Sequence, residues 1–235
     1  MRMRIGLLIL LLGFSASIAR SHPITGAVLQ GWYYDQQDHL ISLRVVNTGD
    51  KIITAFTLDV TITDSDGSSS HSRWTRDFLN SVAYAESGGQ PRGPAPIPVG
   101  ASYDEKIGVS PNYKDFSATL ILAVFADKTA STTDSAALQD LMNIRSANAA
   151  AIDKATELIN ASATLADAQV AIKNYRDTYK ATPHEKLEMQ TGDLENIAND
   201  LKALPDKAAV KDYLTAKKRE RDLWFESAKL QEVTQ

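Results

Sequence analysis

The residues that could hold a metal ion begin with the run Asp64-Ser65-Asp66-Gly67-Ser68. Carboxylates at alternate positions followed by glycine are typical of the start of a calcium-binding loop, in which carboxylate oxygens bind the ion. A complete loop of this kind needs a glutamate at its twelfth position, which is occupied here by Thr75. We therefore predict an ordinary β-turn at residues 64–68 and no metal site.

The four histidines are His22, His39, His71 and His184. None has a second metal ligand at helical or strand spacing, so we predict no zinc site. Serines surround His71, but neighbours on one strand point to opposite faces, and no strand–turn–helix elbow surrounds any serine. We predict no catalytic residues and no cofactor, and we keep an unrecognised hydrolase as an alternative function.

Three aromatic side chains are the candidate binding residues, namely Trp32, Tyr34 and Trp74. Aromatic rings on a sheet can stack on sugar rings or anchor a protein partner. Trp32 and Tyr34 alternate with Tyr33, so one of the two faces of this strand is expected in the core. Core packing is the preferred interpretation, and glycan binding through exposed aromatics is the alternative.

A sheet must position these side chains. Between Ile52 and Thr63, apolar and polar residues alternate, which predicts a central strand of an antiparallel sheet. Further strands are predicted at residues 24–34, 39–47, 68–79, 103–109 and 117–127. Turn signals separate them at the spacing of an immunoglobulin-like antiparallel β-sandwich. Residues 87–98 hold four prolines and three glycines, which predicts a loop that is either mobile or functional.

From Asp134 the apolar period changes from two to three and four, which predicts α-helices. The first apolar stripe includes Arg145, and the fourth extends to Gln231. Four helices joined by short links favour helical hairpins or a four-helix bundle. The stripes are narrow and rich in alanine, so we expect the helices to need the sandwich or a second copy of the chain to complete their core.

One basic run lies in the fourth predicted helix, Lys217-Lys218-Arg219-Glu220-Arg221. A basic helix followed by Trp224 could contact a membrane surface. The interleaved Glu220 instead predicts a solvated helix face.

The predicted fold class is α+β, with a signal peptide at residues 1–19, a β-sandwich domain at 20–130 and an α-helical region at 131–235. The signal peptide is predicted from the basic start and an apolar run of about ten residues, which is shorter than the roughly 20 needed to span a bilayer. No later stretch is long and apolar enough for a membrane span.

The 235-residue chain contains no cysteine, so it has no disulfide and no thiolate metal site. Export without cysteine favours a bacterial protein that is periplasmic or extracellular. Without residues 1–19, 23 basic residues face 29 acidic ones, a net charge of −6. Nucleic acid requires clustered positive charge, so we expect no nucleic-acid partner.

Three segments resemble the small exported β-sandwich modules of bacteria known as FxLYD-type domains: residues 47–52, the alternating strand with the turn Asp64-Ser65-Asp66-Gly67 that follows it, and residues 97–102. Phe125-Ala126-Asp127, followed by a helical tail, is similar to uncharacterised exported bacterial proteins. The resemblance implies a binding or structural role and supplies no catalytic residues.

The sequence therefore predicts a non-enzymatic exported protein that binds a protein partner or associates with itself through its helices. A glycan-binding module and an unrecognised hydrolase are the alternatives.

Overall fold

The alternating segment predicted to be a central strand forms β3, Ile53–Asp64, which pairs with a strand on each side. The computed structural model describes residues 24–86, 93–180, 188–205 and 207–233. The signal peptide predicted at 1–19, residues 87–92 of the predicted loop and the predicted helix start at 182–185 lie outside these residues. The described chain is α+β, with two sheets, and most of its helices follow the sheets in the chain.

The two sheets have the strand orders β1-β2-β5 and β4-β3-β6-β7-β8. All neighbours are antiparallel except β7 and β8, which are parallel. The remaining strands are β1 (Ala27–Asp35), β2 (Leu40–Asn47), β4 (Ser69–Asp77), β5 (Ser102–Gly108), β6 (Tyr113–Phe125), β7 (Thr129–Thr132) and β8 (Gln231–Glu232). The five strands predicted around β3 therefore correspond to β1, β2, β4, β5 and β6.

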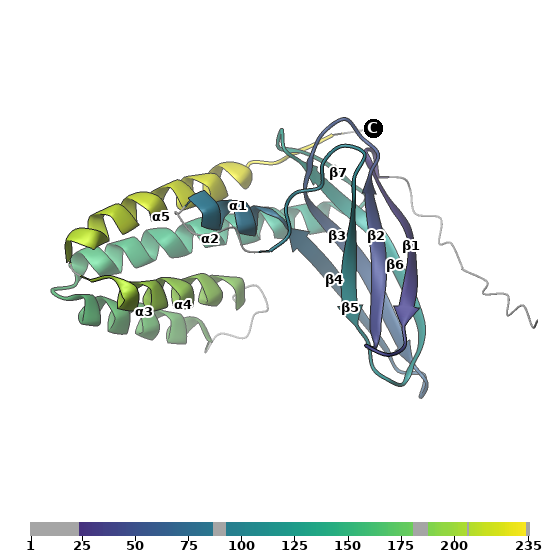
Figure 1. Cartoon of the computed structure of the whole chain (residues 1–235), viewed down its shortest axis with the longest axis horizontal. Coiled ribbons are helices and arrows are strands. Elements are labelled where there is room, and N and C mark those ends of the chain that lie inside the picture. Colours follow the sequence, from purple (N-terminus) through teal and green to yellow (C-terminus); the bar gives the residue numbers. More distant parts are fainter. Residues whose placement is uncertain (1–23, 87–92, 181–187, 206, 234–235) are drawn as a thin grey trace, which may run out of the picture.

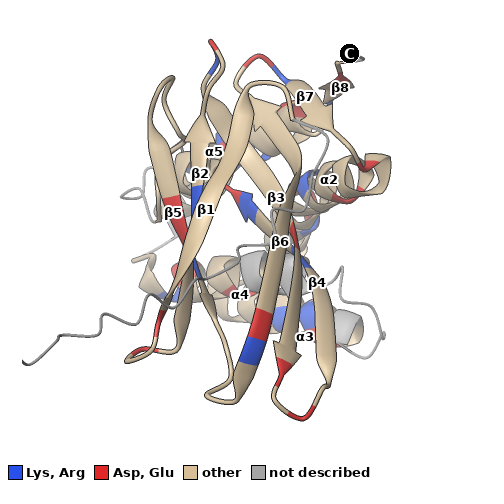
Figure 2. Ribbon diagram, turned by 90° about the vertical axis from the view of Figure 1, so that its right-hand side faces the viewer, with Lys and Arg blue, Asp and Glu red and all other residues tan. Residues whose placement is uncertain are grey.

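The two sheets lie face to face (Figures 1 and 2). Their facing sides share one hydrophobic core. From β2 and β3 it receives residues at alternate positions that are at most 1% exposed: Ile41, Leu43, Val45, Phe56, Leu58 and Val60. Period-two alternation directs these side chains to one face, and burial of each contributes about 1.5–3 kcal/mol. One ion pair crosses between the sheets at their edges, where Arg76 of β4 donates two hydrogen bonds of 2.7 and 2.6 Å to the buried carboxylate of Glu105 on β5.

The helices project from one side of the sheets (Figure 1). They are α1 (Leu79–Glu86), α2 (Ser135–Ala161), α3 (Leu165–Lys180), α4 (Glu188–Ala203) and α5 (Lys207–Ser227). The change of apolar period at Asp134 coincides with the start of α2, because Asp134 is the N-cap residue of this helix. Its carboxylate accepts hydrogen bonds from the backbone N–H groups of Ala136 and Ala137 at 2.9 and 3.4 Å.

The helical region does obtain part of its core from elsewhere in the chain. Leu79 and Ala83 of α1 join the buried apolar residues of α2 to α5 in one cluster. A second cluster joins Leu138 and Leu141 at the start of α2 to the outer side of the larger sheet, including Leu122 of β6. Both α1 and the sheet therefore contribute to the apolar core of the helices.

Three local predictions need correction. The strand predicted at 68–79 ends at Asp77, and α1 follows it directly. The fourth helix ends at Ser227, and Gln231 lies in β8, because the chain returns to the sheet and pairs with β7. None of the helices that the structure describes is long and apolar enough to cross a membrane. The solvated face predicted at Lys217 is also wrong, because this residue is 5% exposed.

Candidate functional site

The predicted aromatic residues lie on the core-facing sides of their strands. Trp32 is 40% exposed at the edge of the smaller sheet. Its ring packs edge-to-face against the ring of Phe116, with 5.4 Å between the two ring centroids. Tyr34 is half-buried, lies 4.9 Å from the ring of Tyr113, and its hydroxyl is 3.0 Å from Nδ1 of His39. Trp74 is half-buried and packs against the core. The structure does not bring these three rings together as one platform.

A β-bulge explains which face Trp32 occupies. The register of β1 on β2 shifts between Leu29 and Gly31, which leaves Gln30 as an extra residue. After the shift, Trp32 pairs with the core residue Leu43, and Tyr33 points to the opposite, outer face. Tyr33 is 59% exposed, the largest exposure among the large apolar and aromatic side chains that the structure describes.

Tyr33 borders a hollow of about 270 Å³ on the outer face of the smaller sheet. Arg44 lies in this hollow and donates two hydrogen bonds to Asp104, from Nε at 2.7 Å and from Nη2 at 2.8 Å. The complete lining is Gln30, Gly31, Trp32, Tyr33, Ser42, Arg44 and Asp104. Sequence reasoning did not single out this site, although the alternation of Tyr33 with Trp32 and Tyr34 was a signal for it.

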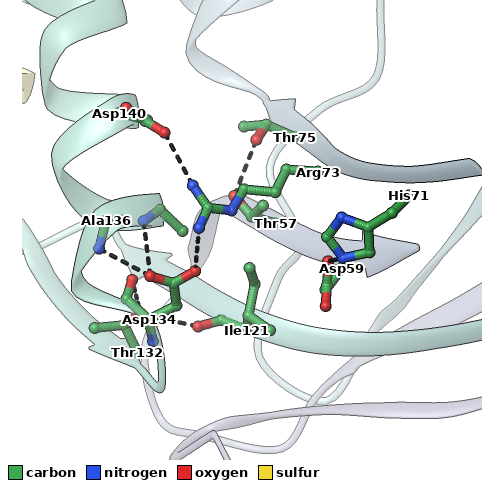
Figure 3. Close-up of polar contacts among 11 residues, drawn as sticks. Thr57, Asp59, His71, Arg73, Thr75, Ile121, Thr132, Asp134, Ala136 and Asp140 are labelled. Atoms are coloured by element: carbon green, nitrogen blue, oxygen red, sulfur yellow. Dashed lines mark hydrogen bonds and ion pairs between the residues drawn. The ribbon is translucent and has the colours of Figure 1, made fainter. Parts of the chain in front are cut away.

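The residues around His71 form polar contacts on the outer face of the larger sheet (Figure 3). Nε2 of His71 lies 2.6 Å from the Oδ1 atom of Asp59 on the neighbouring strand. Next to it, Arg73 contacts Asp134 at 2.6 Å and Asp140 at 3.1 Å, which ties β4 to the first turns of α2. Among the described residues, no hydroxyl group makes a hydrogen bond with His71.

The predicted turn at residues 64–68 is present. Gly67 has a φ of +87°, and Asp66 accepts hydrogen bonds from the backbone N–H and the hydroxyl of Ser68 at 2.8 and 2.7 Å. These hydrogen bonds lower the pKa of the Asp66 carboxyl. Within the part of the chain that the structure describes, no three His, Asp or Glu side chains are grouped so as to hold a metal ion.

The junction between sheets and helices contains a buried arginine. Arg145 of α2 is 1% exposed and donates to both carboxylate oxygens of Asp77, at 2.8 and 3.1 Å. Its third contact is to the backbone carbonyl of Ser227 at the end of α5, at 2.8 Å. Asp77 also accepts from the backbone N–H of Leu79 at the start of α1. Arg145 therefore links the end of β4, the first residues of α1 and the last turn of α5.

The solvated face predicted for residues 217–221 is wrong for two of them. Lys217 and Glu220 are 5% and 7% exposed, and they form an ion pair of 2.8 Å. Asp200 of α4 lies 3.8 Å from Nζ of Lys217 and accepts from the hydroxyl of Tyr213 at 3.2 Å. A charge can be buried where an opposite charge compensates it, and Glu220 and Asp200 supply that charge here. Lys218 remains exposed as predicted.

A groove of about 750 Å³ runs along α2 and α5. Its floor is apolar, with Ile152, Ile159 and Val210 all buried and Leu214 half-buried. The remaining lining is polar or charged: Asp153, Thr156, Asn160, Ser162, Lys211, Thr215, Lys218, Arg221 and Asp222.

The rim of this groove carries uncompensated positive charge. Arg221 contacts Asp153 at 3.0 Å and Asp222 at 3.1 Å, and these two carboxylates raise the pKa of its guanidinium. Lys211 and Lys218 are exposed and have no ion pair with any residue that the structure describes. They are seven residues apart on α5, which places them on one face of the helix about 10 Å apart.

Comparison with known proteins gives no relative from which a function could be transferred. No protein-family model matches the chain, and neither a curated protein nor a solved structure matches it. The functional argument therefore depends on the geometry of the chain itself.

Proposed function

We propose that this chain is a non-enzymatic binding protein, and that the groove between α2 and α5 docks a helical segment of a protein partner. The observation that carries this proposal is an apolar floor beside two exposed lysines that lack a carboxylate partner within the described chain. Buried apolar area supplies affinity, and the position of the charges supplies specificity.

The groove has the dimensions of a short helix. Its lining on α5 extends from Val210 to Asp222, which corresponds to about 18 Å of helix. A partner helix of about three turns fits this length, and it would place apolar residues at positions i, i+4 and i+7 on the floor. Because Lys211 and Lys218 lie about 10 Å apart, the partner needs acidic residues on its flank, also about seven positions apart.

The type of β-sandwich and the location of the protein are proposed from the sequence. The two sheets are proposed to be an immunoglobulin-like β-sandwich of the FxLYD type, and the protein is proposed to be exported to the periplasm or beyond the cell. Support comes from the strand and turn pattern and from the basic and apolar start of the chain. In this view the sheets hold the helical region in place, and the helices bind the partner.

The docking proposal is tested with displayed peptides. A library of helical 15-residue peptides, with apolar residues at i, i+4 and i+7 and random flanks, is selected against the full chain. We expect the selected flanks to be enriched in Asp and Glu, because these residues pair with Lys211 and Lys218. We expect the selected peptides to lose at least tenfold in affinity for the double variant Lys211→Glu, Lys218→Glu.

The matched control is Lys114→Glu, which changes the charge of an exposed lysine on β6 outside the groove. This variant should bind the peptides as the unaltered chain does. The proposal fails if the library yields no binder, or if the groove variant and the control bind the selected peptides equally.

A further inference from the structure

The hollow beside Tyr33 carries an inference that is independent of the helical groove. It lies on the outer face of β1, β2 and β5, and it shares no lining residue with the groove between α2 and α5. Its chemistry also differs. The groove has an apolar floor, whereas the hollow has the exposed ring of Tyr33 and an ion pair, Arg44 with Asp104, whose charges cancel.

The sequence builds this hollow with a glycine at the bulge. Gly31 pairs with Arg44 at a φ of +151°, in a region of backbone conformation that favours glycine. A Cβ atom placed on Gly31 would meet no other atom within 4 Å. Because position 31 is glycine, no side chain at that position fills the hollow that Tyr33 and Arg44 line.

The polar side of the hollow is held in one orientation. Two parallel hydrogen bonds fix the guanidinium of Arg44 against the carboxylate of Asp104, and the side chains are 53% and 42% exposed. The Nη1 group of Arg44 has no hydrogen-bond partner among the described residues, and each carboxylate oxygen has a further lone pair. The pair thus offers unused N–H donors of Arg44 next to unused carboxylate lone pairs of Asp104, with no net charge.

The apolar side of the hollow is the ring of Tyr33. An exposed aromatic ring costs free energy in water, and it can be covered by the C–H face of a sugar ring. The volume of about 270 Å³ is at the lower limit of pockets for drug-sized ligands, which are roughly 300–1,000 Å³. A single ring is the unit that fits.

We propose that this hollow binds one pyranose ring of a neutral oligosaccharide, stacked on Tyr33, with two adjacent hydroxyls held by Arg44 and Asp104. One hydroxyl accepts from Nη1 of Arg44, and its neighbour donates to the Asp104 carboxylate. Sugars whose ring hydroxyls are all equatorial suit the site best, because their axial C–H groups form flat faces that can cover the ring of Tyr33.

The test uses cellohexaose, titrated into the full chain by calorimetry. One stacked ring and two hydrogen bonds should give a Kd on the order of 1 mM. Tyr33→Ala and Asp104→Asn should each weaken binding at least tenfold, whereas Tyr33→Phe should retain it because the ring is kept. Both positions are exposed, and circular dichroism confirms that the variants are folded.

The control is Phe225→Ala, which removes another exposed ring, on α5. It should bind cellohexaose with unchanged affinity. The proposal is overturned if the unaltered chain shows no binding at about 10 mM sugar, or if Tyr33→Ala binds as tightly as the unaltered chain.

Discussion

At the scale of single residues, the neighbours of Asp127 lower the pKa of its carboxyl strongly. It lies between β6 and β7, 2.6 Å from Nζ of Lys51, and accepts hydrogen bonds from the hydroxyl and the N–H of Thr129 at 2.6 and 3.1 Å. The hydrogen bond from Lys51 is the largest cause that lowers the pKa of Asp127 from 3.8 to about 2. The pair connects the segment before β3 to the turn after β6.

This shift predicts a pH-dependent contribution to stability. A carboxyl whose pKa is lower in the folded state stabilises the fold above its unfolded pKa of 3.8, and the contribution is lost as the pH falls through about 2. Because the pair is exposed, we expect Asp127→Asn to lower the free energy of unfolding by at most about 1 kcal/mol at pH 7. Urea denaturation at pH 7, 4 and 2 measures this difference, which should shrink toward the lowest pH.

Asp38→Asn is the control for this prediction, because Asp38 is an exposed carboxylate with no ion pair among the described residues. Its effect on stability should be small at every pH. A difference between Asp127→Asn and the unaltered chain that stays constant from pH 7 to pH 2 would contradict the assignment of the ion pair.

At the scale of elements, Arg145 determines how the helices attach to the sheets. Its side chain contacts Asp77 at the end of β4 and the carbonyl of Ser227 in α5. These contacts also hold α1, whose first N–H is bound by Asp77. The arginine that interrupts the apolar face of α2 is therefore buried, and each of its three side-chain nitrogens donates a hydrogen bond.

We predict that Arg145→Met is strongly destabilising. The substitution removes the guanidinium that neutralises the buried Asp77 carboxylate, which costs about 3–5 kcal/mol. Urea denaturation measures the loss. The double variant Arg145→Met, Asp77→Asn should be more stable than Arg145→Met alone, because the neutral amide can still cap α1 and no charge remains buried.

The opposite ranking, with the double variant less stable than the single one, would show that an uncompensated carboxylate is not the source of the loss. A substitution of the exposed Val170 to Ala provides the reference for a surface change in the helical region. It should alter stability by less than about 0.5 kcal/mol.

At the scale of the whole molecule, several sets of contacts among the described residues join helices and sheets, including the ion pairs of Arg73 with Asp134 and Asp140. Leu138 and Leu141 pack on the outer side of the larger sheet, α1 contributes to the helical core, and Arg145 links β4 to α5. In addition, β8 pairs with β7 after α5 has ended. Such shared contacts make independent unfolding of the two regions costly.

We therefore predict one cooperative unfolding transition for the full chain. In the variant Trp224→Phe, tryptophan fluorescence reports only on Trp32 and Trp74 in the sheets. Circular dichroism at 222 nm reports mainly on the helices. The two signals should change at the same urea concentration, and adding Arg145→Met should separate them. Two distinct midpoints without Arg145→Met would show that the regions unfold independently.

Much of the secondary structure could be predicted from the sequence, because it follows from local periodicity. The alternation in residues 52–63 gives β3, and Asp134 begins α2 because its carboxylate caps the first turn. Which side chains of β1 point to the core was harder to predict from the sequence. The bulge at Gln30 decides this, and it depends on the hydrogen bonds between β1 and β2. The helix α1 was missed because its eight residues give too short a pattern.

The sequence by itself determined the α+β class, six of the strands, the position of most helices after the sheets, and the expectation that the helices need additional partners for their core. Only the tertiary structure decided that Arg145 and Lys217 are buried, that Tyr33 faces outward beside Arg44, and that α2 and α5 enclose a groove. The physical reason is distance along the chain. Periodicity is a property of neighbouring residues, whereas these features arise between residues such as Asp77 and Arg145, which are 68 positions apart.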